Sequence, residues 1–536
     1  MSRVRCWLRR SVESPVAFIR PVLSVCIRAG ARSSGRIPGI KVSTALMPMA
    51  LLVGLSGCAS IGQVTGGDGA TSRYSQSETD ATTSYYRGVH RVIVTYNDET
   101  GSTGTINYGP TSRQVSRGAS LGGWSYSEDH GANWKYGGKL VPPRGWAAVW
   151  GDPAIVTSRT QYGTVFISNL AFPDEKFPAG GVNGPVNAVV GGACIFRSLD
   201  GGQSFLPFQC VTDKSPVPGV VGSSSGHFFD GGSMAAAPNG DIYAAYVDVD
   251  TSQIIIYRSV GGQLDFAPMP GPFASYYVAS HPRIRVGPDG ALFVMAVAKA
   301  RSGPNPQYSL VVNRLYNGAW GIPKVLAFAA VYPDVDMNSS VLGAPLKVRT
   351  GPQFAFDIGA RSEFLDDSVR FLVTQYNDRG WLVIRGGVCS YDLGNCGLWK
   401  GWTFGADTSQ GWRQRIDNFN PAITAFPGII FGPGPGWQAS FLVRYGDSTT
   451  TVDVTRATLG YVNGSAFTIP VNIGVDRPVC PDLRGYWGDY DAHIPVEVLP
   501  SGVRYMRLAT DSSAGCNQRW TYLGQSQHVR GHLYTY

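Results

Sequence analysis

The sequence lacks helical periodicity over almost its whole length. Short runs rich in β-branched and aromatic residues alternate with Gly, Pro, Asn and Asp turns, and glycine alone numbers 68. This pattern excludes a helical fold and predicts an all-β chain. Glutamate is also scarce, since residues 58–536 contain only Glu78, Glu99, Glu128, Glu175, Glu363 and Glu497. Few carboxylates of this type are therefore candidates for acid–base chemistry.

An excess of positive charge is missing from most of the chain. Lys and Arg number 45 against 37 Asp and Glu, but nine basic residues and one acidic residue lie in residues 1–57. The remainder carries 36 charges of each sign. A formally neutral chain has no basic footprint for nucleic acid, so no nucleic-acid partner is predicted.

Metal-binding spacings are absent as well. No Cys-x-x-Cys occurs and the seven histidines are scattered, so neither a zinc site nor a cofactor is predicted. Asp334–Asn338 begins like a calcium loop, but Ser339 and Pro345 at positions six and twelve exclude an EF-hand. A looser calcium site stays open. Gly222–Gly226 matches Gly-x-Ser-x-Gly, but no helical pattern follows it, so the match is a coincidence.

The N-terminal region has the features of an export signal. Basic residues precede the apolar run Val42–Leu55, whose fourteen residues are fewer than the about 20 that a membrane-spanning helix takes. The sequence Leu-Ser-Gly-Cys that ends at Cys58 resembles the lipobox of bacterial lipoproteins, which implies cleavage before Cys58 and acylation of its thiol. An ordinary signal peptide followed by a chance cysteine is the alternative. Ala59 implies transport to the outer membrane, and the side that the protein faces stays open.

Residues 58–87 are rich in Gly, Ser, Thr, Asp and Gln and offer little apolar surface to bury. This composition predicts a flexible tether, with a segment packed along the domain surface as the alternative. The predicted organisation is a lipoprotein signal peptide over 1–57, a lipid-anchored tether over 58–87 and a single domain over 88–530.

Seven similar apolar runs recur in this domain at spacings of about 50–75 residues, which is typical of a repeat fold. The runs are Arg91–Tyr96, Thr164–Asn169, Asp241–Val247, Ala291–Val297, Arg370–Tyr376, Ala439–Tyr445 and Val503–Thr510. Trp-Gly-Asp, His-Pro and Asn-Pro motifs precede several of them. The repeats are therefore expected to start near residues 88, 150, 230, 281, 352, 420 and 488.

Two octets identify the repeat, and both fit Ser-x-Asp-x-Gly-x-x-aromatic. They contain Ser127, Asp129, Gly131 and Trp134, and Ser198, Asp200, Gly202 and Phe205. In such a turn the Asp side chain accepts hydrogen bonds from amides of its own loop, and Gly provides a positive φ. The aromatic side chain packs under the turn. The octets resemble the Asp-box of sialidase-like β-propellers, which implies a propeller of six or seven four-stranded blades, with seven slightly favoured. Residues 259–262 are a degenerate third candidate.

Six cysteines remain beyond Cys58, and 15 pairings are possible. Because propeller blades are local units, the resemblance implies disulfides between cysteines near in sequence. These are Cys194–Cys210, Cys389–Cys396 and Cys480–Cys516.

The resemblance is weaker for activity. The Phe/Tyr-Arg-Ile-Pro signature of sialidases has only one partial counterpart, at residues 36–38 inside the leader. Sialidases also bind the substrate carboxylate with three arginines and use a Glu-activated Tyr as nucleophile. The arginine candidates here are Arg283, Arg361 and Arg484, and the weak catalytic candidates are Arg283, Glu497 and Tyr490.

Acids, an arginine and aromatic faces at the repeat starts are expected to converge on a channel mouth that suits a carbohydrate. The expected ligand-binding residues are Trp150, Asp152, Asp230, His281, Arg283, Asn420, Trp487, Asp489, Tyr490, Asp491 and His493. Turn geometry and hydrogen bonding between blades are their alternative roles. The sequence thus predicts a lipid-anchored, non-catalytic propeller that binds a glycan or an envelope protein. An exo-glycosidase of the sialidase type and a scaffold lipoprotein are the alternatives.

Overall fold

The computed structural model describes a part of one compact unit, Ser56–Tyr536. The described residues are 60–64, 76–98, 120–173, 191–213, 227–279, 281–302, 308–326, 335–337, 348–350, 354–359, 368–376, 382–404, 416–425, 437–445, 452–459, 471–476, 492–499, 502–511 and 528–535. Within them, no helix is both long and apolar enough to cross a membrane.

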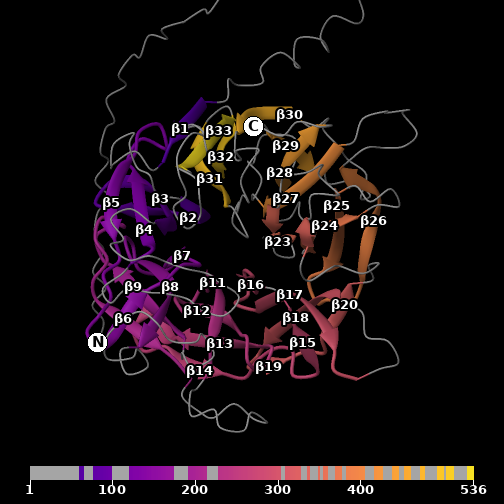
Figure 1. Ribbon diagram of the computed structural model, residues 1–536, viewed down its shortest axis with the longest axis horizontal. Helices are drawn as coiled ribbons and strands as arrows, with labels where there is room; N and C mark the ends of the chain where they lie inside the picture. The colour runs from indigo at the N-terminus through magenta and orange to yellow at the C-terminus, as the bar shows by residue number, and fades with distance from the viewer. Residues whose placement is uncertain are drawn as a thin grey trace, which may run out of the picture. The chain divides into compact units, whose positions relative to one another are not determined.

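The first three sheets, called blades 1 to 3, follow one another along the chain (Figure 1). Blade 1 contains β2 (Gln76–Tyr86), β3 (Val89–Asp98), β4 (Gly122–Ser127) and β5 (Lys135–Lys139). Blade 2 contains β6 (Trp146–Val149), β7 (Ala154–Thr157), β8 (Val165–Pro173), β9 (Gly192–Ser198) and β10 (Phe208–Val211). Blade 3 contains β11 (Phe229–Ala236), β12 (Ile242–Asp248), β13 (Gln253–Ser259), the 3-10 turn Val260–Gly262 and β14 (Ala267–Met269).

Blades 4 to 6 continue in the same way, with the small sheet of β21 (Val335–Met337) and β22 (Val348–Thr350) between the first two of them. Blade 4 contains β15 (Tyr276–Val278), β16 (Arg283–Val286), β17 (Leu292–Ala300), β18 (Ser309–Tyr316), β19 (Ala319–Trp320) and β20 (Lys324–Leu326). Blade 5 contains β23 (Phe354–Ile358), β24 (Ser368–Tyr376), β25 (Leu382–Ser390) and β26 (Cys396–Phe404). Blade 6 contains β27 (Ile416–Ala425), β28 (Trp437–Tyr445), β29 (Val452–Leu459) and β30 (Val471–Asp476).

Blade 7 joins the two ends of the unit. It contains β31 (His493–Leu499), β32 (Gly502–Asp511), β33 (His528–Thr535) and, as its outer strand, β1 (Ser60–Gln63). Strand β1 pairs antiparallel with β33, so the N-terminal strand closes the last blade.

The blades form a closed ring around a central channel. Their inner strands β2, β7, β11, β16, β23, β27 and β31 contact one another in succession, and β31 contacts β2. The predicted all-β propeller is therefore confirmed. Among the described residues, six of these sheets come from continuous stretches of chain and a seventh is completed across both ends.

The seven apolar runs of the sequence are the second strands of the seven blades. In β8 and β12 every residue is buried, because neighbouring blades cover both faces of each sheet. This double burial explains why the runs show no alternation of apolar and polar residues. Aromatic rings fill the layer between blades 2 and 3, where Phe229 stacks on Tyr246 with ring centroids 5.7 Å apart.

The predicted tether is wrong for two stretches. Strand β1 lies within it, and β2, expected to be flexible, is the inner strand of blade 1. The remaining repeat starts lie close to the observed inner strands. The polar composition of β2 gave no sign of a strand, because strands that face the channel need not be apolar. Its polar residues Thr79 and Ser84 are nevertheless buried.

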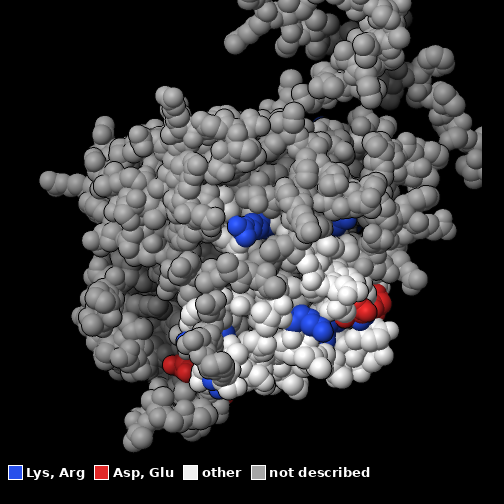
Figure 2. Space-filling model, turned by 90° about the vertical axis from the view of Figure 1, so that its right-hand side faces the viewer, with Lys and Arg blue, Asp and Glu red and all other residues white. Residues whose placement is uncertain are grey.

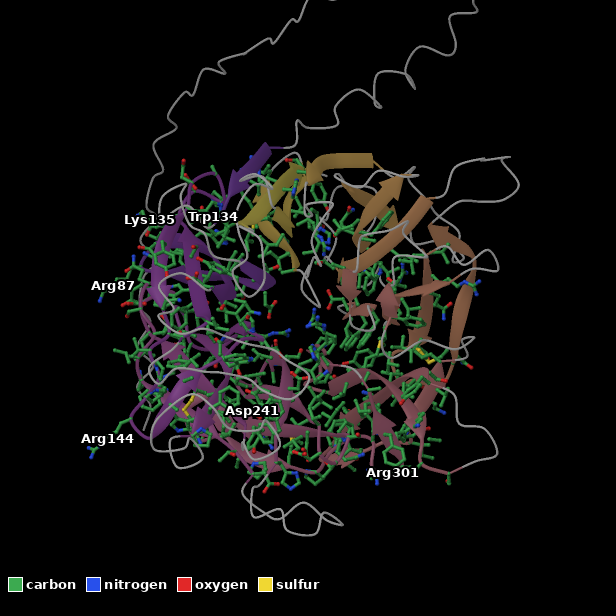
Figure 3. The ribbon with its side chains drawn as sticks, viewed as in Figure 1. Arg87, Trp134, Lys135, Arg144, Asp241 and Arg301 are labelled. Carbon is green, nitrogen blue, oxygen red and sulfur yellow. A yellow bond between two sulfur atoms is a disulfide. The ribbon has the colours of Figure 1, made fainter. Side chains whose placement is uncertain are left out.

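Two of the three predicted disulfides are confirmed, and both are drawn in yellow in Figure 3. Cys194–Cys210 links β9 to β10, and Cys389–Cys396 links β25 to β26, each between residues directly opposite in the sheet. Both therefore attach an outer strand to its blade. Cys58, Cys480 and Cys516 lie outside the described residues, and of the calcium-like segment 334–338 only Val335–Met337, strand β21, is described.

Both Asp-boxes have the expected turn geometry. Asp129 Oδ1 accepts hydrogen bonds from Ser127 Oγ at 2.7 Å and from the amide of Asn133 at 2.8 Å. Gly202 has a φ of 90°, and a Cβ there would lie 2.4 Å from the Ile93 side chain, so only glycine fits. The aromatic of the second box, Phe205, is buried.

A third Asp-box lies at the β25–β26 turn and was missed in the sequence. Ser390 Oγ donates to Asp392 Oδ1 at 2.5 Å, and the Gly394 amide donates to the same oxygen at 2.8 Å. The signal was present as Ser-x-Asp-x-Gly, but Gly397 stands where the aromatic is expected. At the degenerate copy, the Gly261 amide is instead held by Asp241 at 2.9 Å.

Candidate functional site

The channel contains a cavity of about 390 Å³ lined by residues of the inner strands. Its charged lining residues are Asp80 from β2, Arg159 after β7, Arg283 and Arg285 from β16, and Asp357 from β23. Three arginines thus surround one cavity together with two aspartates. Sequence reasoning found Arg283 and missed the other four, because nothing local marks a charged residue as channel-facing.

Hydrogen bonds between neighbouring inner strands explain how the two aspartates are held. Inner strands of adjacent blades have no shared backbone ladder, so side chains satisfy the exposed amides. Asp80 Oδ2 accepts the amide of Ile155 at 2.9 Å, and Asp357 Oδ2 accepts that of Ala425 at 2.7 Å. Ser233 Oγ accepts the Ile284 amide at 3.1 Å in the same way. These aspartates therefore have a structural role as well as a place in the cavity.

Burial controls the charge of both aspartates. It raises the pKa of Asp80, against the opposing effects of the Ile155 amide and the charges of Arg285 and Arg283. It also raises the pKa of Asp357, against the charge of Arg285 and the Ala425 amide. A carboxyl with a raised pKa beside a cation in a cavity is a frequent sign of a functional site.

The arginines contact the carboxylates only in part. Arg285 Nε lies 3.5 Å from Asp357 Oδ1, and Arg159 Nη2 donates to the carbonyl of Val286 at 3.4 Å. Burial lowers the pKa of Arg159, and Asp357 opposes this effect. Guanidinium groups in such a place can bind a carboxylate or another planar oxyanion through paired hydrogen bonds.

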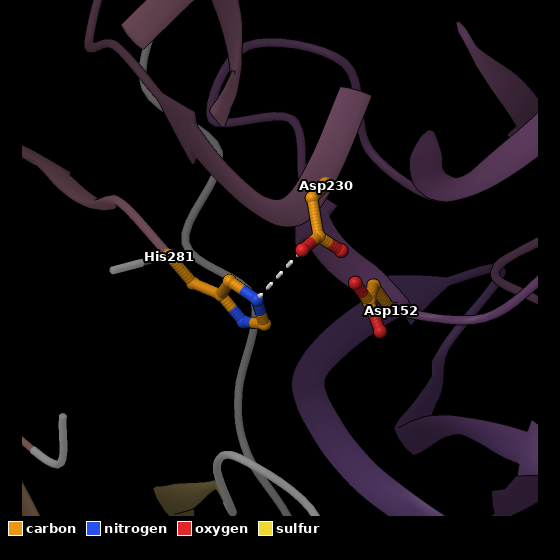
Figure 4. Close-up of side chains that lie close together, drawn as sticks. All are labelled: Asp152, Asp230 and His281. Carbon is orange, nitrogen blue, oxygen red and sulfur yellow. Dashed lines mark ion pairs between the residues drawn. The ribbon is translucent and has the colours of Figure 1, made fainter. Parts of the chain in front are cut away.

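Three of the expected ligand-binding residues do lie close together, at the starts of three neighbouring inner strands (Figure 4). Asp152 precedes β7, Asp230 is the second residue of β11 and His281 precedes β16. One ligand atom from each lies within 4.8 Å of the others. Because successive strands of a blade are antiparallel, the Asp-box turns, which follow third strands, lie at the opposite face.

Of three other expected site residues, Trp150 and Glu497 are not among the residues that line the cavity, whereas His493 is. Trp150 is not a binding platform, because it is 6% exposed and packs edge-on against Phe172 in the core. The ring of His493 stacks on Tyr534 inside blade 7, and burial, followed by the charge of Arg507, lowers its pKa to about 3. Glu497 pairs with Arg504 at 2.8 Å on the blade surface rather than with the channel arginines.

The remaining expected residues are not placed. Asn420 lies in β27, and its side chain is outside the described part. Trp487, Asp489, Tyr490, Asp491, Arg361 and Arg484 also lie outside it. On the face in Figure 2, the described surface is mostly uncharged and carries acidic and basic residues in small separate groups.

No protein-family model and no curated protein matches the chain. Solved structures with a similar arrangement include the NanB sialidase from Streptococcus pneumoniae, with 12% identity over 72% of this chain and 68% of that chain and a TM-score of 0.41. The Hadza microbial sialidase Hz136 has 11% identity over 77% and 73%, with a TM-score of 0.39. The polysaccharide lyase Uly1 has 10% identity over 85% and 89%, with a TM-score of 0.41.

Similarity of this degree carries no activity over to the chain. The sequence of blades, their ring of inner strands and the Asp-box turns establish the architecture by themselves. On these observations the chain is a β-propeller with Asp-box turns.

Proposed function

We propose that this chain is a cell-envelope protein whose central channel binds an acidic carbohydrate without turning it over. The observation that carries the proposal is the cluster of Arg159, Arg283 and Arg285 around one cavity with Asp80 and Asp357. Guanidinium groups recognise a carboxylate by paired, charge-assisted hydrogen bonds. Carboxylate oxygens of the protein accept hydrogen bonds from sugar hydroxyls. A polyhydroxylated ligand with an acidic group satisfies both.

The size of the cavity supports a small ligand. Its volume of about 390 Å³ lies at the lower end of the range of roughly 300–1,000 Å³ for small-molecule sites. One or two sugar units fit this volume, whereas a long polymer would have to enter with one end.

Acylation of Cys58 is part of the same proposal. Strand β1 begins at Ser60, two residues after Cys58, and pairs with β33. An acylated Cys58 would therefore hold blade 7 close to the membrane surface, without the long tether expected from composition. The outer membrane remains the proposed location.

Binding assays with the full chain, produced in an oxidising compartment, test the proposal. Acidic oligosaccharides would be compared by calorimetry with the same compounds carrying esterified carboxylates. We expect binding of the acidic forms only, and at least tenfold weaker binding by Arg285→Gln. The matched control is Arg144→Gln, because Arg144 projects from the outer edge of the molecule in Figure 3. Equal binding of esterified ligands, or an unchanged Arg285→Gln, would refute the proposal.

An exo-glycosidase of the sialidase type is the second candidate. Three arginines in one cavity were its expected mark, and Arg283 is accompanied there by Arg159 and Arg285. Arg361 and Arg484 lie outside the described residues. A carboxyl with a raised pKa, such as Asp357, could act as a general acid. Release of new reducing ends in the same assays, abolished by Arg285→Gln, would favour this candidate. If the chain neither binds nor cleaves any of these compounds, the result would favour the scaffold alternative.

A further inference from the structure

The mouth cluster, defined as Asp152, Asp230 and His281, combines residues that are far apart in the sequence. They come from the starts of the inner strands of three consecutive blades. His281 Nε2 lies 3.7 Å from Asp230 Oδ2, and the three potential ligand atoms lie within 4.8 Å of one another. Ligand atoms bound at about 2.1 Å to one metal ion lie roughly 3–4 Å apart, so a small contraction would suffice.

Groups around the cluster hold the two carboxylates toward a common point. The Gly231 amide donates both to Asp152 Oδ2 at 2.9 Å and to Asp230 Oδ1 at 3.1 Å. The amide of Asp152 donates to Asn97 Oδ1 at 3.0 Å, and the φ of Asp152 is 53°. The backbone of Asp152 is thus held by Asn97 of blade 1, while its carboxylate contacts Gly231 of blade 3.

The approach of His281 depends on a glycine. Gly231 has a φ of 60°, and a Cβ at this position would lie 2.5 Å from the imidazole ring. Any larger residue would push His281 away from the carboxylates. The side chains of His281 and Asp230 are 19% and 41% exposed, so an ion can reach them from solvent.

We propose that the mouth cluster binds a divalent transition-metal ion, and that zinc is the best match. One imidazole nitrogen and two carboxylate oxygens are a donor set that zinc accepts, whereas calcium prefers six to eight oxygens. Three protein ligands leave a coordination position for water or for an oxygen of a ligand in the channel. The sequence predicted no metal site, because the spacings typical of metal ligands join residues that are near one another in the chain. This proposal does not depend on the carbohydrate binding proposed above.

The test is metal binding by the full chain after treatment with a chelator. Calorimetric titration with zinc alone is expected to show one site that is lost, with at least tenfold weaker binding, in Asp230→Asn and His281→Gln. Asp265→Asn is the matched control, because Asp265 is an exposed aspartate elsewhere in blade 3. Zinc binding that is absent, or equally tight in both cluster variants, would overturn the proposal.

A measurement on the unaltered chain covers the case in which the variants fail to fold. X-ray absorption of the zinc-loaded protein is expected to show oxygen and nitrogen ligands with one imidazole. Sulfur ligands, or two or more imidazoles, would place the ion elsewhere and overturn the proposal. Calcium and manganese are titrated in parallel, and tighter binding of calcium than of zinc would contradict the choice of metal.

Discussion

The aspartates of the Asp-boxes and those of the channel all accept hydrogen bonds from backbone amides, yet their pKa values shift in opposite directions. Asp129 and Asp200 accept hydrogen bonds from amides and hydroxyls of their own loops. Asp80 and Asp357 accept hydrogen bonds from amides of their own strand and of the neighbouring inner strand. The pKa is lowered in the first pair and raised in the second.

The balance of burial and hydrogen bonding explains the difference. Burial opposes the charge of Asp129 and Asp200, but several hydrogen bonds to each carboxylate outweigh it. Each channel aspartate has two such amide bonds and nearby arginines, and burial prevails. The charged carboxylate is therefore favoured in the turns, whereas burial favours the neutral carboxyl in the channel.

The largest effect is expected for Asp200→Ala. Its carboxylate accepts hydrogen bonds from Ser198 Oγ, from the amides of Gln203 and Ser204 and from Ser204 Oγ. Their loss should lower the free energy of unfolding by about 2–3 kcal/mol, measured by chemical denaturation beside Asp265→Ala as control. A loss no larger than that of the control would mean that these turns are not stabilised by the carboxylate.

Asp357→Asn should change the pH dependence of stability. The folded pKa is raised above the ordinary 3.8, so the wild type loses stability as pH rises from 3.8 through the raised pKa. Asparagine does not titrate and keeps an acceptor for the Ala425 amide. Above this window the variant should be more stable than the wild type by about 1 kcal/mol, with a flatter profile.

Thermal unfolding between pH 4 and 8 measures this effect. A variant that is less stable than the wild type across the whole range would show that the charge of Asp357 is favourable, and the contrast between channel and turn would fail.

Asp129→Asn should act in the opposite direction. Its folded pKa is lowered, so its contribution to stability is present above 3.8 and is lost as pH falls through the lowered value. The variant should lose stability at neutral pH and become less sensitive to acid. The effect should be less than about 1 kcal/mol, because the side chain is exposed and screened. Denaturant midpoints at pH 7 and pH 3 distinguish this result from a uniform loss at both.

The smallest effect is expected for Ser390→Ala in the third Asp-box. Ser390 Oγ donates to Asp392 and accepts the Asn395 amide at 3.0 Å. The adjacent disulfide Cys389–Cys396 already holds this turn, so the loss should be about 0.5 kcal/mol. The melting temperature should fall more after reduction of the disulfides than before. An equal fall in melting temperature before and after reduction would show that the disulfide does not compensate for the lost hydrogen bonds of the turn.

Much of the fold could be predicted from local sequence. The apolar runs marked the second strand of every blade, because double burial selects apolar residues throughout. The Asp-boxes marked turns, because serine, aspartate and glycine each meet a need within one short loop. The candidate site was predictable only in part. Asp152, Asp230 and His281 were found from motifs at repeat starts, whereas Trp150, in the same motif, faces the core.

By itself the sequence determined the repeat, its turns and two local disulfides, since these depend on contacts between residues near one another in the chain. The tertiary structure alone decided that polar β2 is an inner strand and that β1 closes the ring. It also decided that Arg159, Arg285, Asp80 and Asp357 share one cavity. Closure of a ring brings together residues from different blades, and no local pattern records which of their side chains will face the common axis.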